Sequence, residues 1–267
     1  MGDPEAVACT QSVPRQPWRL LVHGAEPPAW NMAVDEAILD AVVAGLAGPT
    51  LRVYRWDRLS ISVGRFQDAS RDLDLARCAA LAVPVVGRPT GGRAVLHGYD
   101  QTFSVVVPFA LLGATGASVT GSYRLLARAI TRALAGWGVV ARIAVGRAAR
   151  ARSGDCFGAS TRADVVSADG DKLVGSAQCR RRGVLLQQSS LRHLPPPARS
   201  RGLFRGEAAP GDWPLAGIAP NALEEGLISA FREELGLCLS EDTLGAWEVE
   251  RAAALLAART DGLAPAN

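Results

Sequence analysis

The chain has 267 residues, of which 48% are hydrophobic and 21% are charged, and its formal net charge is +3. This length allows one sizeable hydrophobic core, and so small a net charge gives no indication of a nucleic-acid partner. No stretch of the sequence approaches the ~20 consecutive apolar residues that a membrane-spanning helix needs. The composition therefore predicts an ordinary globular protein and excludes an integral membrane protein.

Apolar residues at helical and at alternating spacing, separated by turn residues, predict a mixture of helices and strands. The patterns of the first half predict a strand at 18–24, a helix capped by Asn31 and ending at Gly45, paired strands at 51–56 and 60–64, a short helix at 72–81 and a β-rich stretch over 83–108.

The second half contains the clearest hairpin of the sequence, in which ADVVS and KLVGSAQ are joined by Asp169 and Gly170. The simplest register of this hairpin pairs Lys172 with a position near Ser167. The remaining patterns predict a helix at 122–135, a strand at 139–145, a strand at 183–191, a helix at 221–235 and a weaker helix near Glu250.

The two ends of the chain are expected to lie outside the core. Residues 1–17 are polar and proline-rich and lack the basic and apolar regions of a signal peptide, so they predict a disordered tail. We expect one domain over residues 18–258, helical from about residue 220, and a second tail over 259–267.

Cysteine and histidine usage bears on metals and on the cellular compartment. The cysteines form no CxxC pair, so they favour neither a zinc site nor a disulfide framework and indicate a reduced, cytoplasmic protein. With three histidines in the whole chain, no metal site is expected. The five cysteines are Cys9, Cys78, Cys156, Cys179 and Cys238.

Lys172 is the only lysine, since the other 28 of the 29 basic residues are arginines. An ammonium group is a compact point charge on a slim stem, and it reaches through a slot that is too narrow for a guanidinium fork. Lys172 opens the strand KLVGSAQ, in which Gly175, Ser176 and Ala177 carry so little bulk that a ligand has room beside them. A solvated lysine at a hairpin tip is the alternative interpretation.

Two further segments carry groups suited to chemistry. In RPTGGRAVLH, Gly91 and Gly92 allow the backbone to approach a ligand closely, although the pattern matches no standard nucleotide motif and also suits a simple glycine turn. In SGDCFGAS, the small and polar neighbours of Cys156 indicate a surface loop, although most cysteines are buried hydrophobic residues. Because Asp155 would oppose a thiolate, a reactive Cys156 needs a nearby cation.

Together and in this order, these segments resemble the lipoate–protein ligase A and octanoyltransferase family over roughly residues 18–195. The matching pieces are NMAVDEAIL, LRVYRW…SISVGRFQ, RPTGGRAVLH…QTFSVVVP and DCF…ADVV…GDKLVGSAQ…RRGVLLQ. The resemblance implies an α+β fold of the biotin/lipoate ligase type, with a large mixed β-sheet, a smaller sheet and packed helices. It also implies an acyl-binding tunnel beside the RPTGGRAVLH loop. The substrate-binding residues it implies are Arg88, Thr90, Gly91, Gly92, Arg93, Ala94, His97, Gly175, Ser176 and Ala177.

Cys156-Phe157 stands where one octanoyltransferase branch of the family carries its cysteine, ahead of the lysine hairpin. Such enzymes take octanoate from acyl carrier protein as an enzyme thioester and pass it to a lysine of a lipoyl domain. The resemblance therefore implies that Cys156 and Lys172 are catalytic and that no cofactor is needed, because one thioester is exchanged for another. Lys172 would stabilise the thiolate and face the developing oxyanion.

The transferred group is octanoyl or lipoyl, because an amidotransferase that moves lipoyl groups between proteins would use the same residues. Two other functions also remain open. An ATP-dependent lipoate or octanoate ligase would form an acyl-adenylate bound by Lys172, and would need ATP and Mg²⁺. The roughly 70 residues after the core fall short of the accessory domain of the long ligases, which favours the transferase. The second alternative is a non-catalytic relative that binds acyl groups or lipoyl domains.

The sequence also departs from the family pattern. Family members often have His-Asp-Glu where this chain has His97 followed by Gly-Tyr-Asp-Gln, and they commonly have histidine at the position of Gln188. The missing histidine puts in doubt the proton relay or acyl-pocket contact that it would make.

The partners implied by the resemblance are octanoyl-acyl carrier protein as donor and a lipoyl-domain protein as acceptor, acting with a monomeric enzyme. The acceptor would be the glycine cleavage H protein or a 2-oxo acid dehydrogenase E2 domain. The arginines at 124, 128 and 132, and those at 180–182, either dock an acidic carrier or are simply solvated.

Overall fold

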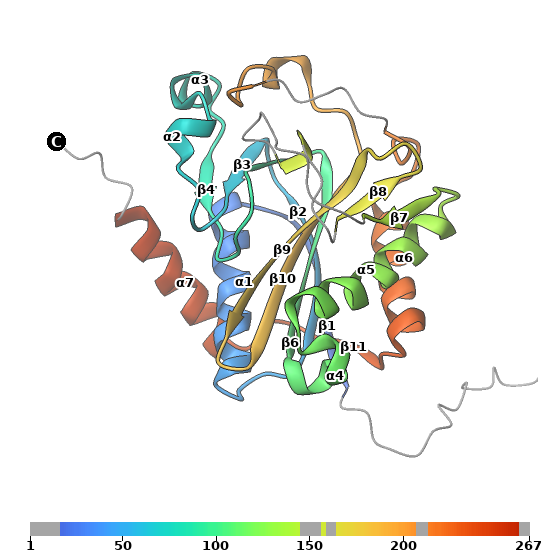
Figure 1. Cartoon of the computed structure of the whole chain (residues 1–267). Coiled ribbons are helices and arrows are strands. Elements are labelled where there is room, and N and C mark those ends of the chain that lie inside the picture. The colour runs from blue at the N-terminus through green and yellow to red at the C-terminus, as the bar shows by residue number, and fades with distance from the viewer. Residues whose placement is uncertain (1–16, 145–155, 159–163, 207–212, 262–267) are drawn as a thin grey trace, which may run out of the picture.

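The structure is a computed structural model that describes residues 17–144, 156–158, 164–206 and 213–261. Its strands form two sheets, as expected, and helices pack against the larger one (Figure 1). The strands of the larger sheet are β1 (Trp18–Glu26), β2 (Thr50–Trp56), β6 (Asp100–Pro108), β7 (Ala141–Ile143), β8 (Val165–Ser167), β9 (Lys172–Arg181), β10 (Val184–Arg192) and β11 (Leu239–Glu241). Those of the smaller sheet are β3 (Ser60–Val63), β4 (Val85–Gly87) and β5 (Val95–His97).

The larger sheet has the strand order β11-β1-β2-β6-β10-β9-β8-β7 and is mixed. The strands β11, β1 and β2 run parallel to one another, whereas every pair from β2 to β7 is antiparallel. In the smaller sheet, of order β4-β3-β5, the central strand is parallel to β4 and antiparallel to β5. The expected combination of a large mixed sheet and a smaller sheet is therefore confirmed.

Helices cover both faces of the larger sheet. The helices are α1 (Pro28–Val43), α2 (Ala69–Asp72), α3 (Leu75–Ala80), α4 (Gly113–Gly116), α5 (Val119–Gly136), α6 (Pro220–Leu235) and α7 (Ala246–Asp261). Figure 1 shows α1 and α7 side by side on one face of the sheet and α5 with α6 on the other. Helix α7 continues to Asp261, so the domain boundary expected at residue 258 lies inside it.

Strand β6 shows why a continuous apolar run forms the centre of this sheet. Side chains alternate between the two faces of a strand, so Val105 and Val107 join the core under α5 and α6, and Val106 joins the core under α1. All three valines are buried. A strand covered by helices on both faces needs apolar residues at every position, as this run provides.

Three local expectations are wrong. The strands at 51–56 and 60–64 do not pair, because β2 belongs to the larger sheet and β3 to the smaller one. The helix expected to begin at Asn31 begins at Pro28, since proline suits the first helical position. The helix expected over 72–81 is shorter, because Asp74 caps the start of α3 at Leu75, and a separate short helix, α2, ends at Asp72.

The hairpin of β8 and β9 is confirmed, with one difference in register. Lys172 lies opposite Val166 rather than Ser167, because the register shifts between Val165 and Val166. This irregularity re-aims side chains next to it. Lys172 is consequently buried, at 5% exposure, and is no solvated residue of the hairpin tip.

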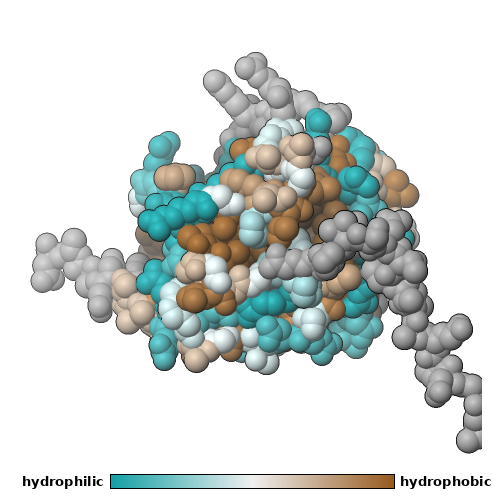
Figure 2. All heavy atoms as spheres, turned by 90° about the horizontal axis from the view of Figure 1, so that it is seen from below, coloured by the Kyte–Doolittle hydropathy of each residue, from teal (hydrophilic) through white to brown (hydrophobic). Residues whose placement is uncertain are grey.

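The outer surface of the molecule mixes polar and apolar residues. Figure 2 shows the molecule from below, where hydrophobic side chains form patches that are bordered by hydrophilic ones. Scattered exposed apolar residues are normal for a globular protein. Among the residues that the structure describes, no helix is both long and apolar enough to cross a membrane.

Candidate active site

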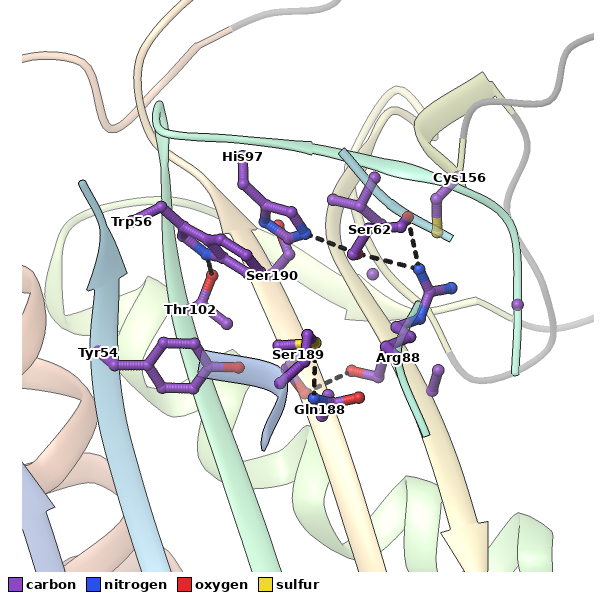
Figure 3. A pocket seen from close by; sticks show the side chains of 16 residues that line it. Tyr54, Trp56, Ser62, Arg88, His97, Thr102, Cys156, Gln188, Ser189 and Ser190 are labelled. Carbon is purple, nitrogen blue, oxygen red and sulfur yellow. Dashed lines mark hydrogen bonds between the residues drawn. The ribbon is translucent and has the colours of Figure 1, made fainter. Parts of the chain in front are cut away.

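A pocket of about 410 Å³, counted to its open mouth, lies between the smaller sheet and the end of the larger one. Its wall comes from the loop between β4 and β5, from the strands β2, β9 and β10, and from Met32 of α1 (Figure 3). Of the residues expected at the site, seven line this pocket. These are Arg88, Gly92, His97, Cys156, Gly175, Ser176 and Ala177.

Cys156 and Lys172 meet at this pocket. The Nζ atom of Lys172 lies 3.2 Å from the Sγ atom of Cys156 and donates a hydrogen bond to it. The same ammonium lies 2.9 Å from the Oδ2 atom of Asp164, which is buried with it. Asp164 directly precedes β8, but the sequence does not single it out because nothing local relates it to Lys172.

The charges around Lys172 keep it protonated. Burial by itself would lower the pKa of Lys172, but the negative charges of Cys156 and Asp164 and their hydrogen bonds outweigh it, so the pKa of Lys172 lies above its ordinary value. The ammonium therefore persists at neutral pH. This positive charge lies at hydrogen-bond distance from the sulfur of Cys156 and faces any negative charge that develops there.

Cys156 is held in place by its backbone. It begins the short 3₁₀ helix Cys156–Gly158, and its N–H donates a 2.8 Å hydrogen bond to the carbonyl oxygen of Ala94 in the RPTGGRAVLH loop. This bond explains how the sulfur comes to lie beside Lys172. The 3₁₀ helix contacts β9 without belonging to the sheet.

Arg88 is a buried cation whose hydrogen-bond acceptors carry no charge. Its five N–H groups all donate to neutral oxygens, and among the residues that the structure describes no carboxylate forms an ion pair with it. Burial lowers the pKa of Arg88, and the negative charge of Cys156 acts in the opposite direction. Because Asp164 balances Lys172, the charge of Arg88 remains to balance a thiolate or an oxyanion in the pocket. The acceptors are the carbonyls of Ser62, Gly91 and Arg93 and the Ser62 hydroxyl.

The donors of Arg88 also set the conformation of the glycine loop. Three of them bind the carbonyl oxygens of Gly91 and Arg93. Gly92 has φ +89°, which favours glycine, and a Cβ atom there would lie 3.0 Å from Arg88. Gly91 and Arg93 do not line the pocket. Their carbonyl oxygens instead accept hydrogen bonds from Arg88 within the loop.

Gln188 occupies the position where the family commonly has histidine. Its Oε1 atom accepts a 2.7 Å hydrogen bond from Thr90, and its Nε2 atom donates a 2.7 Å bond to Asp35 of α1. Asp35 in turn forms a fully buried ion pair with Arg52. The amide thus links the glycine loop to helix α1.

His97 lies in the pocket wall with both ring nitrogens engaged. Its Nε2 atom lies 2.8 Å from the Ser62 hydroxyl and its Nδ1 atom 2.8 Å from a carboxylate oxygen of Asp100. The Trp56 ring is stacked on it, with a centroid distance of 3.9 Å and an interplanar angle of 14°. His97, which the sequence predicts as a polar pocket residue, therefore belongs to a hydrogen-bonded network that the sequence did not reveal.

The arginines considered for carrier docking are mostly engaged within the protein. Arg128 and Arg132 form ion pairs with glutamates of α6. Arg180 donates to carbonyl oxygens before α5, and Arg181 binds Glu36 and Asp40 of α1. These contacts favour a structural role over carrier docking for four of the arginines, Arg128, Arg132, Arg180 and Arg181.

The mixed-sheet fold and a pocket that ends at a cysteine and a buried ammonium define an enzyme that handles acyl groups. The chain belongs to the lipoyl protein ligase A/B catalytic domain family, whose model matches residues 27–193.

Individual relatives refine this assignment. The chain is 40% identical to octanoyltransferase LipM of Kyrpidia tusciae over 264 residues, covering 91% of this chain and 96% of that protein. It is 43% identical to octanoyltransferase LipM of an Exiguobacterium strain, but covers only 65% of either chain. A bi-partite lipoate protein ligase from Thermoplasma acidophilum, described with its E2 lipoyl domain, shares the fold at a TM-score of 0.72 and 22% identity, covering 91% of this chain and 92% of that one.

Proposed function

We propose that this protein is an octanoyltransferase of protein lipoylation, with residues 18–258 as one catalytic unit. It takes an octanoyl group from acyl carrier protein as a thioester on Cys156 and passes it to a lysine of a lipoyl-domain protein. The family and the octanoyltransferase relatives support octanoyl transfer. The observation that carries the mechanism is the 3.2 Å contact between the sulfur of Cys156 and the ammonium of Lys172 at the pocket.

In the first step the Cys156 thiolate attacks the carbonyl carbon of the donor thioester. The bond from carbon to the donor sulfur breaks, and the electron pair leaves with the carrier's thiol. Since one thioester replaces another, no ATP is required. The octanoyl chain lies in the pocket, beside the strand Gly175, Ser176 and Ala177, where side chains leave space.

In the second step the neutral amine of the acceptor lysine attacks the enzyme thioester. A new C–N bond forms, the C–S bond breaks, and the amine releases a proton to solvent. The tetrahedral intermediate carries an oxyanion, which the ammonium of Lys172 and the charge of Arg88 stabilise, and the sulfur of Cys156 leaves as a thiolate. Removing one preorganised donor of this kind typically costs ~10²–10³ in rate.

The acceptor is a lipoyl domain of the glycine cleavage H protein or of a 2-oxo acid dehydrogenase E2 component, and the enzyme acts as a monomer. A structural neighbour that was described with an E2 lipoyl domain supports this class of partner. All four cysteines that the structure describes are free thiols. A thiolate enzyme needs a reducing compartment, which favours the cytoplasm.

The test is the intact mass of the enzyme after mixing with octanoyl-acyl carrier protein in the absence of ATP. We expect one octanoyl group on the wild type, removable by hydroxylamine, and none on Cys156→Ser. Addition of a lipoyl domain should then discharge the wild-type adduct onto its lysine. An unmodified wild type without ATP, together with octanoylation of the lipoyl domain once ATP and Mg²⁺ are present, would favour the ligase instead.

A further inference from the structure

The acyl pocket carries a second set of reactive side chains besides Cys156 and Lys172. Ser62 of β3 and His97 of β5 both line it, and Asp100 stands behind His97 at the start of β6. The distances are 2.8 Å from Ser62 Oγ to His97 Nε2 and 2.8 Å from His97 Nδ1 to Asp100 Oδ2. Figure 3 shows Ser62 between His97 and Arg88. A serine, a histidine and an aspartate linked in this order form the arrangement that activates a hydroxyl as a nucleophile.

The hydrogen positions follow from the partners of Asp100. Burial raises the pKa of Asp100, but the positive charge of a protonated His97 and the hydrogen bonds from His97 and from two hydroxyls outweigh it, so this pKa lies below its ordinary value and the group is a carboxylate. A carboxylate only accepts hydrogen bonds, so Nδ1 of His97 carries the hydrogen. In the neutral form of the ring, Nε2 then offers a lone pair to the hydroxyl of Ser62, as a general base must. The two hydroxyls belong to Thr102 and Ser190.

Further contacts hold the ring of His97 in addition to its hydrogen bonds to Ser62 and Asp100. Trp56 is stacked on it, and the indole N–H of Trp56 donates a 2.8 Å bond to the hydroxyl of Thr102, which binds Asp100. The indole and the carboxylate are therefore held together by one network. Such support fixes the orientation of a catalytic imidazole.

Ser62 is suited to carry negative charge. Nη1 of Arg88 lies 3.1 Å from its Oγ atom, so the hydroxyl donates to His97 while it accepts from a guanidinium. The two strands do not need this hydroxyl to stay together, because β3 and β5 are already paired through their backbones.

We propose that Ser62 and His97, oriented by Asp100, form a second catalytic centre that hydrolyses medium-chain acyl esters and thioesters independently of Cys156. Oγ of Ser62 attacks the acyl carbon and its proton passes to Nε2 of His97. The bond to the leaving oxygen or sulfur breaks, and the leaving group takes the proton from His97. Water then attacks the Ser62 ester and gives a proton to His97, the C–Oγ bond breaks, and Oγ regains that proton.

This activity goes beyond octanoyl transfer and does not rest on it. A hydrolytic centre in the same pocket would release acyl groups that reach no acceptor. Because its nucleophile is Ser62, the activity persists when Cys156 is absent, and failure of one mechanism leaves the other untouched.

The experiment uses three variants of the full chain: Cys156→Ala, Cys156→Ala with Ser62→Ala, and Cys156→Ala with Ser60→Ala. Ser60 is the matched control, because it lies two residues earlier on β3, is fully buried, and its hydroxyl has no hydrogen-bond partner among the described residues. Hydrolysis of p-nitrophenyl octanoate is measured, with the acetate ester as a chain-length control. Cys156→Ala is also treated with an octylphosphonofluoridate, and the modified peptide is identified by mass spectrometry.

We expect Cys156→Ala to hydrolyse the octanoate ester faster than the acetate ester. Adding Ser62→Ala should lower this rate at least tenfold, and adding Ser60→Ala should change it less than twofold. The probe should modify the peptide that contains Ser62. Hydrolysis that persists in the Ser62→Ala variant, or a probe that leaves the Ser62 peptide unmodified, would overturn the proposal. The probe experiment needs no change at Ser62, so it decides even if that variant does not fold.

Discussion

Gly175 lies beside the sulfur of Cys156: a Cβ atom added to Gly175 would stand 3.1 Å from Sγ of Cys156 and 3.2 Å from Cε of Lys172. Contacts this short force the neighbouring atoms to move by a few tenths of an ångström. The small residues of KLVGSAQ, expected to make room for a ligand, thus also make room for the cysteine–lysine pair itself.

Gly175→Ala should therefore slow the acylation of Cys156. Misplacement of reacting groups by about 1 Å can cost ~100-fold in rate, so a shift of a few tenths of an ångström should cost about tenfold. The measurement is the rate of octanoyl transfer from acyl carrier protein to Cys156. Gly136→Ala is the control, since nothing lies within 4 Å of a Cβ atom there. An unchanged rate in a folded Gly175→Ala protein would show that the pair tolerates displacement.

Replacement of Lys172 should reduce the reactivity of Cys156. Lys172→Met removes the ammonium, and Lys172→Arg places a wide fork in a slot bounded by Gly175, Asp164 and the sulfur. We expect alkylation of Cys156 by iodoacetamide at pH 7 to slow about tenfold or more in both variants. Cys238 is exposed and serves as an internal control in the same digest. If Cys156 in the Lys172→Arg variant were alkylated as fast as in the wild type, a positive charge of either shape would be sufficient to make Cys156 reactive.

Gln188→Leu should destabilise the protein. The change leaves the hydroxyl of Thr90 without its acceptor, and an unsatisfied buried group costs about 1–3 kcal/mol. Oδ2 of Asp35 loses the amide donor but keeps the hydrogen bond from Tyr54. The measurement is the midpoint of urea unfolding. Gln188→His introduces the residue common in the family and should restore part of the loss, because a ring nitrogen can keep one of the two bonds. Equal stability of the Leu variant and the wild type would contradict this role of the amide.

His23 should make the stability depend on mildly acidic pH. Burial, and then the positive charge of Arg52, lower the pKa of His23 from 6.5 to about 4. Below pH 6.5 the unfolded chain takes up a proton that the folded protein does not accept until about pH 4, so stability falls as the pH is lowered through this range. His23→Gln keeps an acceptor for Arg52 and removes the titrating group.

The check is the urea midpoint of both proteins at pH 7.5 and at pH 5. The wild type should lose more stability than His23→Gln between these two values. Identical losses in the two proteins would mean that other groups cause the pH dependence.

Several features of this protein could be predicted from local sequence. The hairpin of β8 and β9 and the glycine loop depend on residue types at short spacing, which local backbone preferences decide. The apolar run of β6 also predicted a buried strand, because a strand covered on both faces must be apolar throughout.

Only the tertiary structure decided the rest, because those features join segments that are remote in sequence. Alternation of side chains predicts that β2 and β3 are strands, but it carries no information about which sheet each one joins. Likewise no local pattern relates Asp164 to Lys172, or Ser62 to His97 and Asp100. The sequence by itself determined which groups this pocket contains, and the folding of two sheets against each other determined which of them meet. Burial then set their charges, since a group removed from water depends on the partners that the fold brings to it.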